Sequence, residues 1–125
     1  MQIRVYYEDT DAGGVVYHSN YLNFCERARS EFFFTKGFSP IIDDAHFVVR
    51  KIDCDFLSPA LFGDTLFVKT NILNMKNASL TLSQEITREN KVIFKATIML
   101  VLVKNSKVQK INKDIKTFLN SVFIQ

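Results

Sequence analysis

The order of the periodic segments constrains the fold most, because a single helical stretch is followed by a run of strand-like segments. Within residues 19–36, apolar residues recur at helical spacing on one face: Tyr21, Cys25, Ala28 and Phe32. Gly37 is placed for a left-handed C-terminal cap, and Pro40 prevents the helix from continuing. The pattern therefore predicts one long helix over residues 19–36.

Strand-like segments lie on both sides of this helix. Residues 2–8 are rich in β-forming types and predict a first strand, and four more strands are predicted after the helix: 47–56, 66–75, 80–88 and 92–103. The turns between them are short, which favours antiparallel neighbours. A last short strand is predicted at 108–109, and a terminal helix over 112–123 would carry the apolar stripe Ile115, Phe118, Leu119 and Val122.

Segment 92–103 is apolar on both faces for most of its length, so it belongs in the middle of the sheet or at a subunit contact. Only one substantial helix is available to cover the sheet, so the sheet should curl around it. We expect an α+β fold in which an antiparallel sheet of five or six strands wraps one long helix, in a single domain over residues 1–125. The uncovered sheet face predicts a homodimer or homotetramer.

Composition excludes several classes of protein. With 47% hydrophobic and 23% charged residues, the chain is typical of a globular protein and not of a disordered tail. No window approaches the apolar run of a membrane span, and the N-terminus enters a strand-like segment without a secretory signal. Cys25 and Cys54 have neither disulfide-framework nor metal-ligand spacing, so we expect a reduced, cytoplasmic compartment and no metal.

Charge is concentrated near the C-terminus. Residues 104–116 hold five lysines against Asp114 alone, a local charge of +4 in a chain whose net charge is +3. Such a stripe is either a solvated face or a surface for an anionic partner. It contains no interleaved aromatic residues and no nucleic-acid-binding motif, so we expect no nucleic-acid partner.

The residues that suggest chemistry lie between the first strand and the long helix. Glu8, Asp9 and Asp11 place three carboxylates within four positions, while Gly13 and Gly14 let the backbone approach a ligand closely. His18 stands where the helix would present free N–H groups, a place that suits a developing oxyanion. Each feature taken alone also fits an ordinary turn; their combination favours a catalytic site.

This region resembles a known signature. Residues 7–22 (YEDTDAGGVVYHSNYL) and 26–31 (ERARSE) resemble the motif of hotdog-fold acyl-CoA thioesterases, in the small single-domain group related to 4-hydroxybenzoyl-CoA thioesterase and nearest the YbgC-like proteins associated with the Tol–Pal system. The resemblance continues through 47–51, 59–60, 63–64 and 78–80. It implies a sheet wrapped around one helix, in agreement with the element order.

The resemblance also implies roles. Asp11 would act as nucleophile on the thioester carbonyl or as the base for water, and the backbone N–H of His18 would polarise that carbonyl. The His18 side chain would orient water or stabilise the leaving thiolate. Supporting and substrate-binding positions would be Tyr7, Gly13, Gly14, Tyr17, Glu26, Lys76 and Ser79, of which Lys76 and Ser79 would contact the pantetheine and phosphates.

The implied reaction converts an acyl-CoA and water to a carboxylic acid and coenzyme A, with no cofactor besides the substrate. The C-terminal lysines would contribute to coenzyme A binding or dock an acidic acyl carrier protein. Two alternatives stay open: a hydratase or dehydratase on the same fold, and a non-catalytic acyl-carrier or envelope-complex partner. The phenylalanines at the helix end, Phe32, Phe33, Phe34 and Phe38, would serve core packing, a subunit contact or an acyl tunnel.

Overall fold

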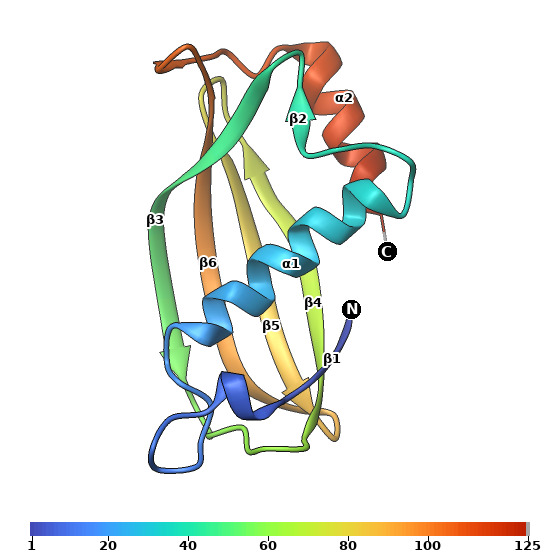
Figure 1. Cartoon of the computed structure of the whole chain (residues 1–125). Coiled ribbons are helices and arrows are strands. Elements are labelled where there is room, and N and C mark those ends of the chain that lie inside the picture. The colour runs from blue at the N-terminus through green and yellow to red at the C-terminus, as the bar shows by residue number, and fades with distance from the viewer. Residues whose placement is uncertain (125) are drawn as a thin grey trace.

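The computed structural model describes residues 1–124; Gln125, the last residue of the predicted domain, lies outside them. A curled antiparallel sheet wraps a long helix, which crosses its concave face (Figure 1). The elements in chain order are β1 (Gln2–Arg4), the 3-10 helix η1 (Tyr7–Asp9), α1 (Asn20–Phe34), β2 (Ile41–Ile42), β3 (Ala45–Phe56), β4 (Thr65–Met75), β5 (Leu80–Arg88), β6 (Lys91–Lys104), β7 (Lys107–Val108) and α2 (Lys113–Val122).

The strand order explains why one segment is apolar on both faces. The sheet runs β1-β4-β5-β6-β3-β2, and the two-residue β7 pairs with β6 as a seventh strand. This confirms the expected fold class, with six strands along the main path. β6 lies between β5 and β3, so both of its edges are paired and residues such as Phe94, Ile98 and Leu102 are buried. The predicted position in the middle of the sheet is therefore confirmed.

Helix α1 supplies the core on the concave face. It buries Tyr21, Phe24, Cys25, Ala28 and Phe33, whereas Phe32 is only half-buried against the same core. The predicted C-terminal cap is confirmed: Gly37 has φ +81°, its N–H donates to the Phe34 carbonyl over 3.0 Å, and the Phe38 N–H donates to the Phe33 carbonyl over 2.9 Å. This pair of bonds is the Schellman motif, which satisfies the last helix carbonyls.

The first predicted strand is wrong beyond Arg4, since β1 ends there and residues 7–9 form η1. The physical reason is the Asp9 side chain, whose Oδ2 accepts the Tyr6 N–H over 2.9 Å and turns the chain. Such local bonding to the backbone competes with strand pairing. Strand β2 was not predicted, and the last short strand begins one residue earlier than predicted.

The C-terminal helix forms as predicted. The Asn112 side chain caps α2 by accepting the Ile115 N–H over 2.9 Å. Leu119 and Val122 are buried, and Ile115 and Phe118 pack against the core. Lys36 Nζ, just beyond α1, donates to the Val122 and Ile124 carbonyls over 2.5 and 3.2 Å and so joins the ends of the two helices.

Strand β3 leaves one long edge of the sheet open. On its outer side β3 pairs only with β2, at Ala45 and His46. From residue 47 to residue 56, no described strand pairs with this edge. Val48, Val49 and Phe56 are exposed along the strand. An open strand edge of this length is a template for pairing with another strand.

Neither described helix has the length and apolar character that crossing a bilayer requires.

Candidate active site

A tight loop joins η1 to α1 and carries Asp11. Thr10 and Val16 form an antiparallel bridge, and inside it the Asp11 N–H donates to the Val15 carbonyl over 2.9 Å. Gly14 completes the turn at φ +81°, a left-handed conformation that glycine adopts without strain. The loop therefore holds Asp11 at an exposed tip while its two sides are hydrogen-bonded to each other.

The carboxylate of Asp11 is oriented by its neighbour two residues on. The Gly13 N–H donates to Asp11 Oδ1 over 2.8 Å. A Cβ on Gly13 would lie 3.2 Å from that same oxygen. A side chain at Gly13 would therefore make the Asp11 carboxylate shift by a few tenths of an ångström, so this glycine matters for the space it leaves and not for its backbone angles.

Asp9 has a structural role, in agreement with the turn-forming alternative that the sequence left open for it. Its carboxylate is buried, with Oδ1 accepting from Asn20 Nδ2 over 2.6 Å and Oδ2 accepting the Tyr6 N–H. Its backbone carbonyl accepts the Tyr17 N–H over 2.9 Å. One residue therefore joins η1, the loop and the first residue of α1. The signal in the sequence was its spacing of three from Tyr6, a common side-chain-to-backbone distance in turns.

His18 lies just before α1, in agreement with the predicted position. Among residues 1–124, its backbone N–H has no acceptor, and α1 begins two residues later at Asn20. The His18 ring lies 4.3 Å from the Tyr17 ring, and both residues are exposed. A free N–H at the positive end of a helix dipole can bind a developing negative charge on oxygen.

A pocket of about 290 Å³ opens beside His18. It is mostly apolar and is lined by Val16, His18, Tyr21, Phe56, Leu57, Ser58 and Pro59. Aromatic rings form one wall, since the Tyr21 and Phe56 centroids are 5.6 Å apart. The site thus combines an apolar cavity with a backbone donor at its edge.

The segment between β3 and β4 supports the loop. The Ala60 N–H donates to the Tyr21 hydroxyl over 3.0 Å, and the Ala60 carbonyl accepts the Val16 N–H over 2.9 Å. Arg88 Nη1 pairs with Asp64 Oδ2 at 2.8 Å and closes this segment onto β5. These bonds position the pocket wall and the Asp11 loop relative to each other.

Several predicted site residues lie elsewhere in the protomer. Tyr7 is exposed and stacks on Phe62 with centroids 4.0 Å apart. Glu26 lies further along α1 and lines different pockets from that of His18. Lys76 and Ser79 follow β4, whose ten residue steps separate them from the Asp11 end of the sheet by about 33 Å. One protomer therefore does not bring Lys76 and Ser79 to Asp11.

Lys76 and Ser79 instead line a basic hollow of about 750 Å³ at the far end of the sheet, together with Arg50 and Lys51. The pairing register of β3 shifts at Arg50, which marks a bulge. The lysine-rich C-terminal segment joins this hollow, since the Ile111 N–H donates to the Asn77 carbonyl over 2.7 Å. Arg50 and Lys51 were not predicted as site residues, because their proximity to Lys76 depends on the pairing of distant strands.

The two cysteines are free, and no cluster of three metal-ligating side chains occurs among residues 1–124. Burial raises the pKa of the Cys25 thiol to about 12, which keeps it protonated and unreactive near neutral pH.

Known proteins resemble this chain in both sequence and structure. A model of the family described as the Thioesterase superfamily matches residues 13–94. The acyl-CoA thioesterase YbgC of Helicobacter pylori is 51% identical over 86 residues, covering 69% of this chain and 65% of that protein. The acyl-CoA thioester hydrolase YbgC of Escherichia coli O6:H1 is 41% identical over 111 residues, covering 86% and 83%. The crystal structure of a probable thioesterase from Bartonella henselae matches with a TM-score of 0.83 and 33% identity, covering 90% and 97%.

The curled sheet around a single long helix, shared with such structures, defines a hotdog fold. The chain belongs to the thioesterase superfamily. It spans about two thirds of the length of the Helicobacter relatives, 65%.

Proposed function

We propose that the protein is an acyl-CoA thioesterase that hydrolyses the thioester bond to give a carboxylic acid and coenzyme A. One observation carries the proposal: the Asp11 carboxylate is held on a glycine loop that leads into the start of α1, where the His18 N–H has no acceptor among the described residues. The names of the YbgC relatives support the same activity.

The reaction uses these two groups on opposite sides of the carbonyl. The thioester oxygen accepts a hydrogen bond from the His18 N–H, which stabilises the negative charge that develops during attack. Asp11 either removes a proton from the attacking water or attacks the carbonyl carbon itself. The C–S bond then breaks, and the coenzyme A thiolate leaves and takes up a proton. In the second route, water hydrolyses the resulting anhydride.

The active protein is a homodimer in this proposal, formed through the open edge of β3. The edge is basic at Arg50 and Lys51 and acidic at Asp53 and Asp55. Antiparallel pairing of two copies about a two-fold axis near Ile52 sets the basic half of each strand opposite the acidic half of the other. The edge is therefore complementary to itself.

The same pairing accounts for the separation of Lys76 and Ser79 from Asp11. In an antiparallel dimer the strands of the partner run in the opposite direction. The partner subunit's Lys76 and Ser79 therefore approach the sheet end of the first subunit where its Asp11 lies. The basic hollow with Arg50 and Lys51 then suits the phosphates of coenzyme A. Each dimer would hold two sites, each built from both subunits, and two dimers could associate as a tetramer.

The lysine segment 104–116 extends this basic surface and is proposed to dock an acidic acyl carrier protein. Lys107, Lys110 and Lys113 would supply the attraction, which salt screens. Replacing these three by glutamate tests the idea, since carrier-protein binding should then be lost. Unchanged binding would contradict it.

The free cysteines support a reducing, cytoplasmic location.

Thiol release from acyl-CoA thioesters of increasing chain length tests the proposed activity. We expect turnover by the native protein and a loss of about three orders of magnitude or more in Asp11→Ala, the scale that removing a reacting group typically produces. Equal turnover by the variant would overturn the assignment. Hydration of crotonyl-CoA without thiol release would identify a hydratase instead.

A further inference from the structure

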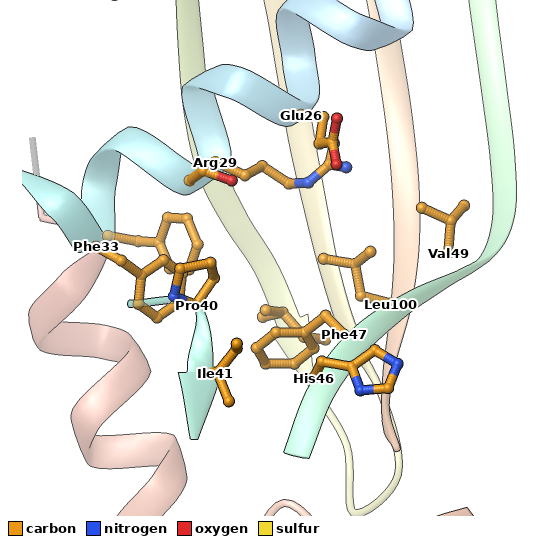
Figure 2. A pocket seen from close by; sticks show the side chains of 12 residues that line it. Glu26, Arg29, Phe33, Pro40, Ile41, His46, Phe47, Val49 and Leu100 are labelled. Carbon is orange, nitrogen blue, oxygen red and sulfur yellow. The ribbon is translucent and has the colours of Figure 1, made fainter. Parts of the chain in front are cut away.

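Three pockets lie one after another along α1 on the side that faces β3, and we call this row of pockets the groove. The groove begins at the pocket that His18 and Phe56 line, at the start of α1. This first pocket shares no lining residue with the other two. Further along the helix lie two adjoining pockets that share Glu26, Arg29 and Val49. The last of them, of about 190 Å³, lies beside the second half of α1 (Figure 2).

This last pocket is mainly apolar, with side chains of Phe33, Pro40, Ile41, Phe47, Leu80 and Leu100 in its walls. Arg29 crosses its helix side, and Pro40, Ile41 and Phe47 lie across the pocket from it (Figure 2). Glu26 and His46 also line the pocket, but both are exposed to water, whereas Arg29 is half-buried. Arg29 is therefore the charged group that is least hydrated here.

The Arg29 guanidinium is held by a neutral partner. Its Nη1 donates to Gln84 Oε1 over 2.9 Å, and the buried Gln84 amide donates in turn to the Cys25 carbonyl and the Thr70 hydroxyl. Within residues 1–124, no carboxylate lies within 4.0 Å of this guanidinium. Burial lowers the pKa of Arg29, and the charges of Cys25 and of the exposed Glu26 carboxylate offset only part of this effect. The guanidinium has further donors for an anion.

The position of the guanidinium sets its distance from the reacting end. Because Gln84 bonds both Arg29 and the Cys25 carbonyl, the guanidinium lies at the level of Cys25 on the helix. Cys25 is five residues beyond the first residue of α1, which corresponds to about 8 Å along the axis. An acyl chain that starts near the His18 N–H and follows the groove therefore reaches Arg29 after several methylene groups.

We propose that this groove binds the acyl chain and that Arg29 binds a carboxylate at its far end, so that the preferred substrates are thioesters of dicarboxylic acids. The inference rests on the proposed thioesterase function and adds its substrate class. The apolar walls take the methylene groups, while the planar guanidinium matches a carboxylate with two parallel hydrogen bonds.

Matched pairs of substrates test the inference. The kcat/KM values of succinyl-, adipoyl- and suberoyl-CoA are compared with those of butyryl-, hexanoyl- and octanoyl-CoA. We expect a preference for the carboxylate of roughly tenfold or more at one chain length, the scale of a hydrogen bond to a charged group. Arg29→Met should bring the ratio of kcat/KM between the carboxylated and the unsubstituted substrate of the same length close to one.

Arg27→Met is the control, because Arg27 is an exposed arginine on the same helix that lines none of these pockets. It should keep the preference. If Arg29→Met does not fold, the chain-length series with the native protein decides alone. A ratio near one at every length overturns the inference.

Two further outcomes also overturn it. A preference that Arg29→Met retains means that another group binds the carboxylate. Weaker subunit association in Arg29→Met with unchanged substrate ratios means that Arg29 pairs with a partner subunit. Hydrolysis of unsubstituted acyl-CoA that depends on Asp11, without a carboxylate preference, refutes only this inference. Absence of any thiol release refutes the proposed function as well.

Discussion

Gly13 donates its backbone N–H to Asp11 Oδ1 over 2.8 Å, and any Cβ at this glycine would lie 3.2 Å from the same oxygen. The carboxylate and the glycine therefore form one unit. The space that Gly13 leaves and the backbone angle that Gly14 supplies can be tested separately, because Gly14 has a positive φ and Gly13 does not.

Gly13→Ala should lower kcat by about 10- to 100-fold, because the added methyl group displaces the carboxylate by a few tenths of an ångström and misaligned reacting groups lose rate steeply. The melting temperature should stay close to that of the native protein. Gly14→Ala should instead destabilise the fold by roughly 1 kcal/mol, the cost of a left-handed residue with a Cβ. Acyl-CoA turnover and thermal unfolding measure both, and an unchanged kcat in Gly13→Ala would contradict the account.

His18→Ala separates the two possible roles of this residue. The backbone N–H persists in the variant, so a rate loss of less than about tenfold is expected if only the N–H binds the thioester oxygen. A loss of kcat as large as that in Asp11→Ala would show that the imidazole of His18 itself takes part in catalysis. Thiol release with a single acyl-CoA at several concentrations gives kcat and KM for this comparison.

Asp9→Ala should reduce the free energy of unfolding by about 2 to 3 kcal/mol, because the Tyr6 N–H and the Asn20 amide lose a charged acceptor in a buried place. Urea denaturation measures the change. Glu8→Ala is the matched control, since Glu8 is an exposed carboxylate next to Asp9 and no hydrogen bond joins its side chain to the described residues. A similar loss in both variants would be inconsistent with the specific role of Asp9.

Asp53→Lys should weaken the proposed dimer, because two basic residues would then face each other across the β3 edges. The double variant Lys51→Asp/Asp53→Lys should restore association, since it exchanges the charges and keeps them opposite. Within a protomer these two side chains lie 3.6 Å apart and both are exposed, so the fold does not depend on them. Sedimentation on dilution measures the dissociation constant; no difference between single and double variants would argue against this interface.

The stability of the protein should fall at alkaline pH because the buried Cys25 thiol then loses its proton. Burial raises the pKa of its thiol from 9.0 to about 12, so the folded protein holds this proton more tightly than the unfolded chain. The contribution of the thiol to stability is therefore full below pH 9 and is lost as the pH rises toward 12. Urea denaturation at about pH 8 and about pH 10.5 should show a steeper decline for the native protein than for Cys25→Ala. Parallel declines would contradict the effect.

Periodicity alone predicted much of the fold. The recurrence of Tyr21, Cys25 and Ala28 predicted α1. The two-sided apolar character of 92–103 predicted a strand in the middle of the sheet or at a subunit contact, and β6 takes the first of these positions. The end of β1 was missed, because the Asp9 side chain takes the Tyr6 N–H and strand propensity does not register such a bond. β2 has only two residues, too few for any period to appear.

The candidate site could be predicted only where its parts are close in sequence. Asp11, Gly13 and His18 lie on one loop, so their types and their spacing along the chain were enough to indicate chemistry. Arg50 lies near Lys76 only because β3 pairs with β6 and β6 pairs with β5. No local pattern in the sequence predicts such pairing between distant strands. The hydrogen bond between Arg29 and Gln84 could not be predicted for the same reason, since the two residues are fifty-five positions apart in the sequence.

The bond between Asp9 and Asn20 fixes the Asp11 loop to the first residue of α1. The position of the reacting groups is therefore set at the start of the helix, whereas Val49 and Phe47 line pockets further along it. Substitutions around Val49 or Phe47 would change which acyl groups fit the pocket without altering the reacting groups. Related proteins could therefore evolve different substrate specificities while they keep the same catalytic loop.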